Sequence, residues 1–87
     1  MLENQIKNEL RNFINSNFMV SEELRGFLDS DSFLYKGIID SMGVVELLAF
    51  IQNEYRIKVE PAEVLPKNFD SLDNLSRYIR SKKGILS

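Results

Sequence analysis

The sequence predicts an all-α fold, a four-helix bundle with one short third helix and a long loop between helices 1 and 2. Apolar residues recur at helical spacing in three segments, roughly residues 2–16, 41–55 and 71–81. The second and third segments each begin at an Asp-Ser pair, and short polar side chains of this kind are favoured at helix N-caps. Residues 56–60 alternate like a strand, but the sequence offers no second strand to pair with them.

The first predicted helix spans roughly residues 2–16 and is amphipathic. Residues 17–40, which follow it, show no sustained periodicity. A connection this long in a compact domain is expected to have a function or to pack as an ordered loop. We expect apolar side chains to anchor it to the bundle, namely Phe18, Val20, Leu24, Phe27, Leu28, Phe33 and Leu34.

The second predicted helix runs from about Ser41 to Tyr55, and apolar residues cover most of its circumference. A helix of this kind is normally central and buried. Its narrow polar arc contains Gly43, Glu46, Asn53 and Glu54. Phe50 falls inside that arc, so we expect an exposed ring that either docks a partner or folds back on the long loop.

The predicted third helix is a single turn over residues 61–65, with proline at its first position and a stop before Pro66. Residues 56–60 before it are predicted to form an extended linker. The last helix is predicted over residues 71–81, with Asp70 or Ser71 as its cap.

The chain of 87 residues is predicted to form a single domain over residues 1–81, with a flexible C-terminal tail over residues 82–87. It contains no Cys and no His. No disulfide or thiolate metal site can therefore form, and the usual general base and metal ligand are missing. An enzyme built only from Asp, Glu, Lys, Ser and Tyr is possible, but these residues show no clustering around a motif. We therefore expect no catalytic residues, no metal site and no enzymatic activity.

The formal net charge is −2, but the charges are unevenly distributed. Residues 37–66 contain five acids and two bases, a net charge of −3, and residues 67–87 contain two acids and five bases, a net charge of +3. No basic patch is interleaved with stacking aromatics, so a nucleic-acid partner is not expected. No signal-peptide core or membrane-spanning apolar run occurs, and we expect a cytoplasmic monomer without membrane insertion.

The junction between the loop and the second helix, residues 37–47, has the most informative sequence pattern in the chain. Asp40 and Ser41 can both cap the helix, because a short side-chain oxygen accepts a bond from a first-turn N–H. A helix start also carries partial positive charge, which would favour an anion attached at Ser41. Capping alone would explain the pair without any modification.

The longer pattern, Gly-x-x-Asp-Ser-Met-x-x-Val-Glu-Leu from Gly37 to Leu47, resembles the attachment site of acyl carrier and peptidyl carrier proteins. The resemblance extends from about Ile6 to Ile79. It implies that Ser41 receives a 4′-phosphopantetheine arm from coenzyme A, whose thiol carries acyl or aminoacyl groups as thioesters. The missing cysteine fits a carrier whose working sulfur arrives on a prosthetic group.

The resemblance also implies partners and a recognition surface. The partners would be a phosphopantetheinyl transferase, a loading ligase and downstream synthase or transferase enzymes of fatty acid or secondary-metabolite biosynthesis. Asp40 and Met42 would flank the attachment serine as recognition and capping positions. Glu46 would supply the acidic contact one turn on, and Phe50 would add an apolar one.

Departures from the family pattern leave three hypotheses open. Gly43 replaces the acid that usually follows the triplet in carriers of fatty acid synthesis. Glycine costs a helix about 1 kcal/mol relative to alanine, so we expect it to permit close approach of a partner. The wording from Ile38 to Gly43 looks more like stand-alone carriers paired with adenylating ligases. The hypotheses are an acyl carrier, an aminoacyl carrier for D-alanine or a peptide synthetase, and an unmodified helical interaction module.

A second Asp-Ser-Leu triplet occupies residues 70–72. It lacks the upstream glycine and the downstream Val-Glu-Leu, and it opens a short helix near the end of the chain. We therefore expect Ser71 to be structural and Ser41 alone to be modified.

Overall fold

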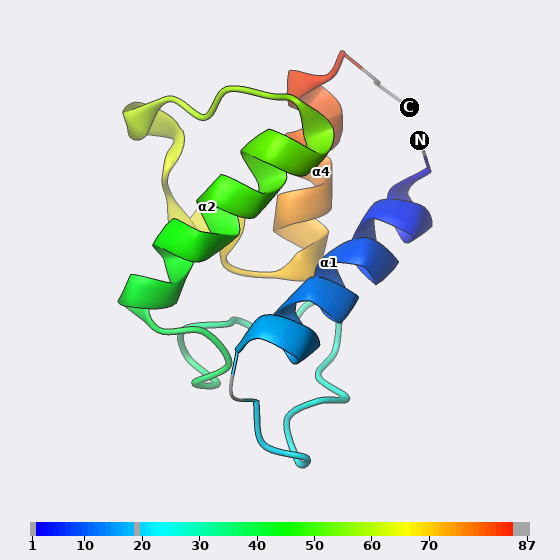
Figure 1. Cartoon of the computed structure of the whole chain (residues 1–87), viewed down its shortest axis with the longest axis vertical. Helices are drawn as coiled ribbons and strands as arrows, with labels where there is room; N and C mark the ends of the chain where they lie inside the picture. Colours follow the sequence, from blue (N-terminus) through cyan, green and yellow to red (C-terminus); the bar gives the residue numbers. More distant parts are fainter. Residues whose placement is uncertain (1, 19, 85–87) are drawn as a thin grey trace.

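The computed structural model describes residues 2–18 and 20–84 (Figure 1). The elements are α1 (Glu3–Asn17), α2 (Ser41–Tyr55), the 3-10 turn η1 (Pro61–Glu63), α3 (Pro66–Phe69) and α4 (Leu72–Lys82). Within the described ranges there is no strand, so the all-α prediction is confirmed. The three longer helices lie where the apolar periodicity predicts them, and none of the described helices is both long and apolar enough to cross a membrane.

The short helical segment between α2 and α4 is built differently from the prediction. One turn was expected to end before Pro66, but Pro66 begins a second turn, α3. Proline suits the first position of a helix because the N–H that it lacks would have no partner there. The N–H of Asp70 closes α3 on the carbonyl of Pro66 at 3.0 Å, and Ser71 then caps α4.

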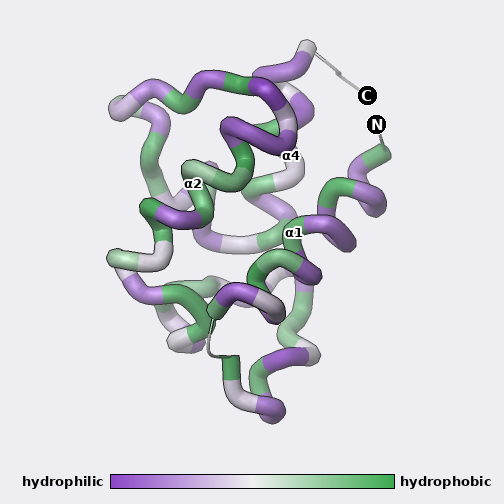
Figure 2. Tube along the Cα trace, in the orientation of Figure 1, coloured by the Kyte–Doolittle hydropathy of each residue, from purple (hydrophilic) through white to green (hydrophobic). Residues whose placement is uncertain are grey.

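The core lies where one face of each longer helix meets the others. α1 and α4 pack directly on each other, and in Figure 2 hydrophobic and hydrophilic residues alternate along α1 in short runs. The fully buried side chains of the three helices are Ile6, Leu10, Ile14, Leu47, Ile51, Tyr55, Leu72, Leu75, Ser76 and Ile79.

α2 is buried along one strip only, so the prediction of a helix buried nearly all round is wrong. The strip consists of Gly43, Leu47, Ile51 and Tyr55, spaced four residues apart. On the other side, 78 % of Met42 and 66 % of Val45 are exposed. The segment after α2 packs toward α4, where Glu63 accepts a hydrogen bond from the Tyr78 hydroxyl at 2.8 Å. It therefore does not cover Met42 and Val45.

The long loop is ordered against the bundle, as predicted, but through a partly different set of anchors. Val20, Phe27 and Phe33 are buried, and Phe18 and Leu24 pack on the core. The predicted anchors Leu28 and Leu34 are instead 65 % and 48 % exposed. Each of these two residues begins a tight turn, since the carbonyl of Leu28 accepts from the N–H of Asp31 and that of Leu34 accepts from the N–H of Gly37. The anchors not predicted are Ile38 and Ile39, which are 4 % and 2 % exposed.

The first turn of α1 and the last turn of α4 lie at the same end of the molecule (Figure 1). The Arg80 Nη1 group donates to Glu3 Oε1 at 2.9 Å there. Lys83 follows α4 directly, and its Nζ group donates to the carbonyl oxygen of Tyr55 at 2.9 Å. Of the tail predicted over residues 82–87, Lys82 belongs to α4 and residues 85–87 lie outside the described residues.

Candidate functional site

Ser41 is the first residue of α2, and Asp40 is the N-cap. The Asp40 backbone is extended, and its Oδ1 accepts a hydrogen bond from the N–H of Gly43 at 2.7 Å. Its carbonyl oxygen accepts from the N–H of Val44 at 3.3 Å. The predicted capping role of Asp40 is confirmed. Because the acid performs this role, the side chain of Ser41 is left exposed on the surface.

The second triplet has the opposite arrangement. Ser71 is the N-cap of α4, where its Oγ accepts a hydrogen bond from the N–H of Asn74 at 3.0 Å, and only 5 % of the residue is exposed. Asp70 does not cap α4, since its carboxylate bonds to the long loop. The prediction that Ser71 is structural is confirmed, and the two serines differ in both burial and hydrogen bonding.

The first turn of α2 is electrostatically suited to a phosphate ester at Ser41. Asp40 accepts from the N–H of Gly43, while the N–H groups of Ser41 and Met42 have no carbonyl partner within the helix. These groups and the helix dipole concentrate partial positive charge at the start of α2. The exposed hydroxyl leaves room for a bulky substituent, so the residues present fit an attached phosphopantetheine group.

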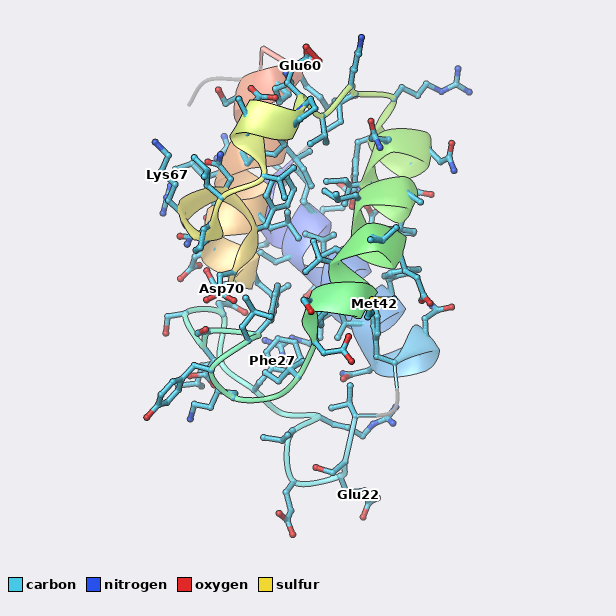
Figure 3. All side chains as sticks on the ribbon, turned by 90° about the vertical axis from the view of Figure 1, so that its left-hand side faces the viewer. Glu22, Phe27, Met42, Glu60, Lys67 and Asp70 are labelled. Carbon is cyan, nitrogen blue, oxygen red and sulfur yellow. The ribbon has the colours of Figure 1, made fainter. Side chains whose placement is uncertain are left out.

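The surface of α2 beside Ser41 is apolar with one acidic side chain. Met42 lies on the outside of α2 in Figure 3, and Val45 is exposed on the next turn. Glu46 is also exposed, one turn beyond Met42. The predicted recognition residues Asp40, Met42 and Glu46 therefore lie around the serine in positions that a partner can reach.

Phe50 is not the free ring that the polar arc suggested. It is half-buried and stacks on Phe13 of α1, with the ring centroids 3.9 Å apart and the ring planes at 15°. It also forms a T-shaped pair with Tyr55 at a centroid distance of 6.4 Å. The expectation of an exposed ring is wrong because α1 crosses this part of α2 and supplies an aromatic partner. A docking role for Phe50 remains a prediction.

Gly43 permits a close approach, but the approach is internal. A Cβ atom at this buried position would lie 2.7 Å from Cε1 of Phe18 and 2.8 Å from Cγ2 of Ile39. Carbon atoms in contact are normally 3.5–4.0 Å apart, so a side chain here would overlap both neighbours. The expectation that Gly43 exposes backbone to a partner is therefore wrong. Glycine instead lets the long loop pack on the first turn of α2.

An apolar pocket of about 110 Å³ opens beside the first turn of α2, at Val44. Three segments that are far apart in the sequence form it: the end of the long loop, α2, and the segment from η1 to α3. Its lining residues are Phe33, Leu34, Ile39, Val44, Val64, Leu65, Pro66, Phe69 and Asp70. Sequence periodicity did not indicate this pocket, because no single segment contains enough of its wall to produce a pattern.

One wall of the pocket is held in place by Glu63, which precedes Val64 and Leu65. Its Oε1 accepts hydrogen bonds from the N–H of Glu60 at 3.0 Å, the Tyr78 hydroxyl at 2.8 Å and Lys82 Nζ at 3.0 Å. The Glu60 N–H, followed by Lys82 and Tyr78, lowers the pKa of Glu63 to about 2. Burial raises the pKa of Tyr78, and the hydrogen bond to Glu63 raises it further.

The site thus combines an exposed serine at a capped helix start, an apolar surface and an adjoining apolar pocket. Within residues 2–18 and 20–84, no group of Asp and Glu side chains is arranged to hold a metal ion.

In comparisons with known proteins, neither a protein-family model nor a curated protein matches this chain.

Proposed function

We propose that this chain is an acyl carrier protein that bears a 4′-phosphopantetheine arm on Ser41. The observation that carries the proposal is the contrast between the two Asp-Ser triplets. Asp40 caps α2 and leaves Ser41 exposed, whereas Ser71 itself caps α4 and is buried. Modification by another enzyme needs an accessible hydroxyl, and only the first triplet offers one. The arm would supply a thiol that holds acyl groups as thioesters.

The residues around Ser41 would hold and present the attached group. Asp40 keeps the first turn of α2 closed, so that the free N–H groups of Ser41 and Met42 face the charge of the phosphodiester. The exposed side chains of Met42, Val45 and Glu46 would contact the phosphopantetheinyl transferase, the loading ligase and the downstream enzymes. None of these residues performs chemistry on the cargo.

The pocket beside α2 favours an acyl cargo over an aminoacyl one. Eight of its nine lining residues are apolar, and the carboxylate of the ninth, Asp70, already accepts hydrogen bonds from Ser32 and Leu34. A charged ammonium group would therefore lose its hydration there without a free partner. An apolar cavity of about 150 Å³ accommodates a benzene molecule, so a pocket of about 110 Å³ matches a short acyl group. An acyl carrier is therefore the first candidate, and a D-alanyl or peptidyl carrier is the second.

Intact-mass measurement after incubation with a phosphopantetheinyl transferase and coenzyme A tests the proposal. The wild-type chain and Ser71→Ala should both gain the mass of the arm, and Ser41→Ala should gain none. Ser71→Ala should also lose about 0.5–2 kcal/mol of stability in urea denaturation, because it removes an N-cap. Modified Ser41→Ala protein, or a wild-type chain that stays unmodified, would contradict the proposal. The second result would favour an unmodified interaction module.

Loading the arm with different cargoes distinguishes the two kinds of carrier. The transferase can attach the arm from butyryl-coenzyme A or from D-alanyl-coenzyme A, and the urea midpoint of each product is then measured. A butyryl group that enters the apolar pocket should raise the midpoint above that of the unacylated form. An increase with D-alanyl but not with butyryl would favour the aminoacyl carrier.

A further inference from the structure

The second Asp-Ser-Leu triplet is not explained by the cap of α4 alone, because its first residue faces away from that helix. The Asp70 carboxylate accepts two hydrogen bonds from the long loop. One comes from the hydroxyl of Ser32, and the other comes from the N–H of Leu34 to Oδ1 at 3.0 Å. The carbonyl oxygen of Asp70 accepts a third from the N–H of Phe33 at 2.9 Å. Asp70 thus binds the loop through both its side chain and its backbone.

The part of the loop that Asp70 holds, residues 32–39, folds as one compact unit, which we call the docking turn. Phe33 is its centre, and its ring is buried. The carbonyl oxygen of Phe33 accepts from the N–H of Ile38 at 2.8 Å and from that of Ile39 at 3.3 Å. The turn closes at Gly37, whose φ of +72° favours glycine. A displacement of Phe33 would therefore move Ile38 and Ile39 with it.

The docking turn ends directly at the attachment site. Ile39 immediately precedes Asp40 and Ser41, and its Cγ2 lies against the backbone of Gly43 in the first turn of α2. The contacts form a continuous path from Asp70 through Phe33 and Ile39 to the start of α2. In Figure 3, Asp70 and Met42 lie at a similar height on different elements, both above Phe27 of the long loop.

We propose that Asp70 is a positioning residue for the modification of Ser41, an inference that rests on the proposed function. Asp70 has no direct contact with Ser41. It acts by holding the docking turn, which fixes the approach of the chain to α2 and one wall of the apolar pocket. The second triplet thereby orients the first, and a transferase recognises Ser41 in the geometry that Asp70 maintains.

The test compares variants of the full-length chain by two measurements at a temperature well below unfolding. The first is kcat/KM for phosphopantetheine transfer to Ser41. The second is hydrogen exchange of the Ile38 and Ile39 amides in the unmodified chain. Asp70→Ala removes both side-chain bonds to the docking turn. Ser32→Ala removes one of them, together with the bond that Ser32 Oγ accepts from the N–H of Tyr35 at 3.0 Å, and leaves the start of α4 intact. Asp70→Asn retains a carbonyl oxygen that can accept from Leu34.

Asp70→Ala should lower kcat/KM for transfer about tenfold and accelerate exchange at Ile38 and Ile39, as expected when two hydrogen bonds are lost. Ser32→Ala should have a smaller effect in the same direction, and Asp70→Asn should recover most of the wild-type rate. The matched control is Asp29→Asn in the same loop. It weakens ion pairs to Lys7 and Arg11 but leaves the docking turn in place. This control should lower stability without changing either measurement.

The possible failures are distinguishable. If the wild-type chain accepts the group and folded Asp70→Ala and Ser32→Ala accept it at the wild-type rate, the positioning role is overturned while the proposed function stands. The role is also overturned if Asp29→Asn slows transfer as much as Asp70→Ala. If the wild-type chain accepts no group, the proposed function itself fails. The exchange measurement then still reports whether Asp70 holds the docking turn.

Discussion

At the scale of single residues, close packing explains why a glycine and a phenylalanine occupy two positions of α2. Gly43 is buried where Phe18 and Ile39 approach the helix backbone, and Phe50 is stacked on Phe13. Both residues lie in the arc that the sequence marks as polar and solvent-facing. A helical wheel assigns residues to faces by angle alone, whereas a neighbouring element decides which of those faces is covered.

Gly43→Ala should destabilise the protein although alanine is the better helix former. Overpacking costs about 1–3 kcal/mol, and the gain in helix propensity of about 1 kcal/mol offsets only part of it. The urea midpoint should therefore fall. Gly26→Ala is the matched control, since a Cβ there meets no atom within 4 Å. A Gly43→Ala protein as stable as Gly26→Ala would contradict the packing described for Phe18 and Ile39.

Phe50→Ala should lower the stability by about 1–3 kcal/mol, because it removes a half-buried ring and an aromatic stack. Met42→Ala provides the comparison, since 78 % of Met42 is exposed and its removal should leave the midpoint nearly unchanged. Partner affinity measured on folded protein should show the reverse order, with the larger loss for Met42→Ala. A stable Phe50→Ala protein that binds its partner weakly would restore Phe50 as a docking residue.

At the scale of elements, the positions of the helices depend on residues nearby in the sequence, whereas the paths of the segments between them depend on contacts with distant residues. The capping aspartate and the apolar period predicted α2 with the bounds that the structure shows, Ser41–Tyr55. The one-sided burial of α2 could not be predicted, since it depends on where residues 56–65 turn. The same holds for Leu34 and Ile39, whose exposure follows from the fold of the docking turn rather than from their own hydrophobicity.

Only part of the candidate site could likewise be predicted from the sequence. Asp40 and Ser41 could be assigned because a helix start is a local feature with a recognisable sequence pattern. The apolar pocket could not, because Val44 and Leu65 come together only when three separate segments fold. The role of Asp70 was hidden for a similar reason, since its partners Ser32 and Leu34 precede it by more than thirty residues.

The segment from η1 to α3 should become less firmly held in acid because of Glu63. Its pKa in the folded protein is about 2, below the usual value of 4.5. The resulting stabilisation is fully present above about pH 4.5 and is lost as the pH falls toward 2. The free energy of unfolding of Glu63→Gln should therefore fall less steeply between these pH values than that of the wild type. Parallel curves, measured by urea denaturation at each pH, would contradict the contacts to Tyr78 and Lys82.

At the scale of the whole molecule, one cationic side chain joins three parts of the fold. Lys7 on α1 contacts Asp73 of α4 at 2.6 Å, Glu3 of α1 at 3.1 Å and Asp29 of the long loop at 3.5 Å. Only 13 % of the Lys7 side chain is exposed. The hydrogen bond to Asp73 is the largest cause that raises the pKa of Lys7. Lys7 therefore remains charged at neutral pH and holds the three carboxylates together.

Lys7→Gln should cost about 1–2 kcal/mol, between the values for exposed and buried ion pairs. It leaves three carboxylates close together, so added salt should stabilise the variant more than the wild type, since the Debye length falls to about 3 Å at 1 M. Urea midpoints at low and high NaCl give the measurement. Lys58→Gln is the control, because Lys58 is exposed and, among the residues that the structure describes, pairs with Glu60 alone, at 3.9 Å. Equal salt responses of the Lys7 and Lys58 variants would contradict this role.

The placement of the helix ends has a consequence for joining this chain to other polypeptides. The start of α1 and the end of α4 meet at one end of the molecule, where Lys83 also contacts the last residue of α2. Ser41 lies at the opposite end of α2, and a helix of 15 residues is about 22 Å long. A tether, affinity tag or solid support attached beyond either outer helix would therefore leave the approach to Ser41 open. The chain could be immobilised or built into a larger polypeptide with this serine still facing outward.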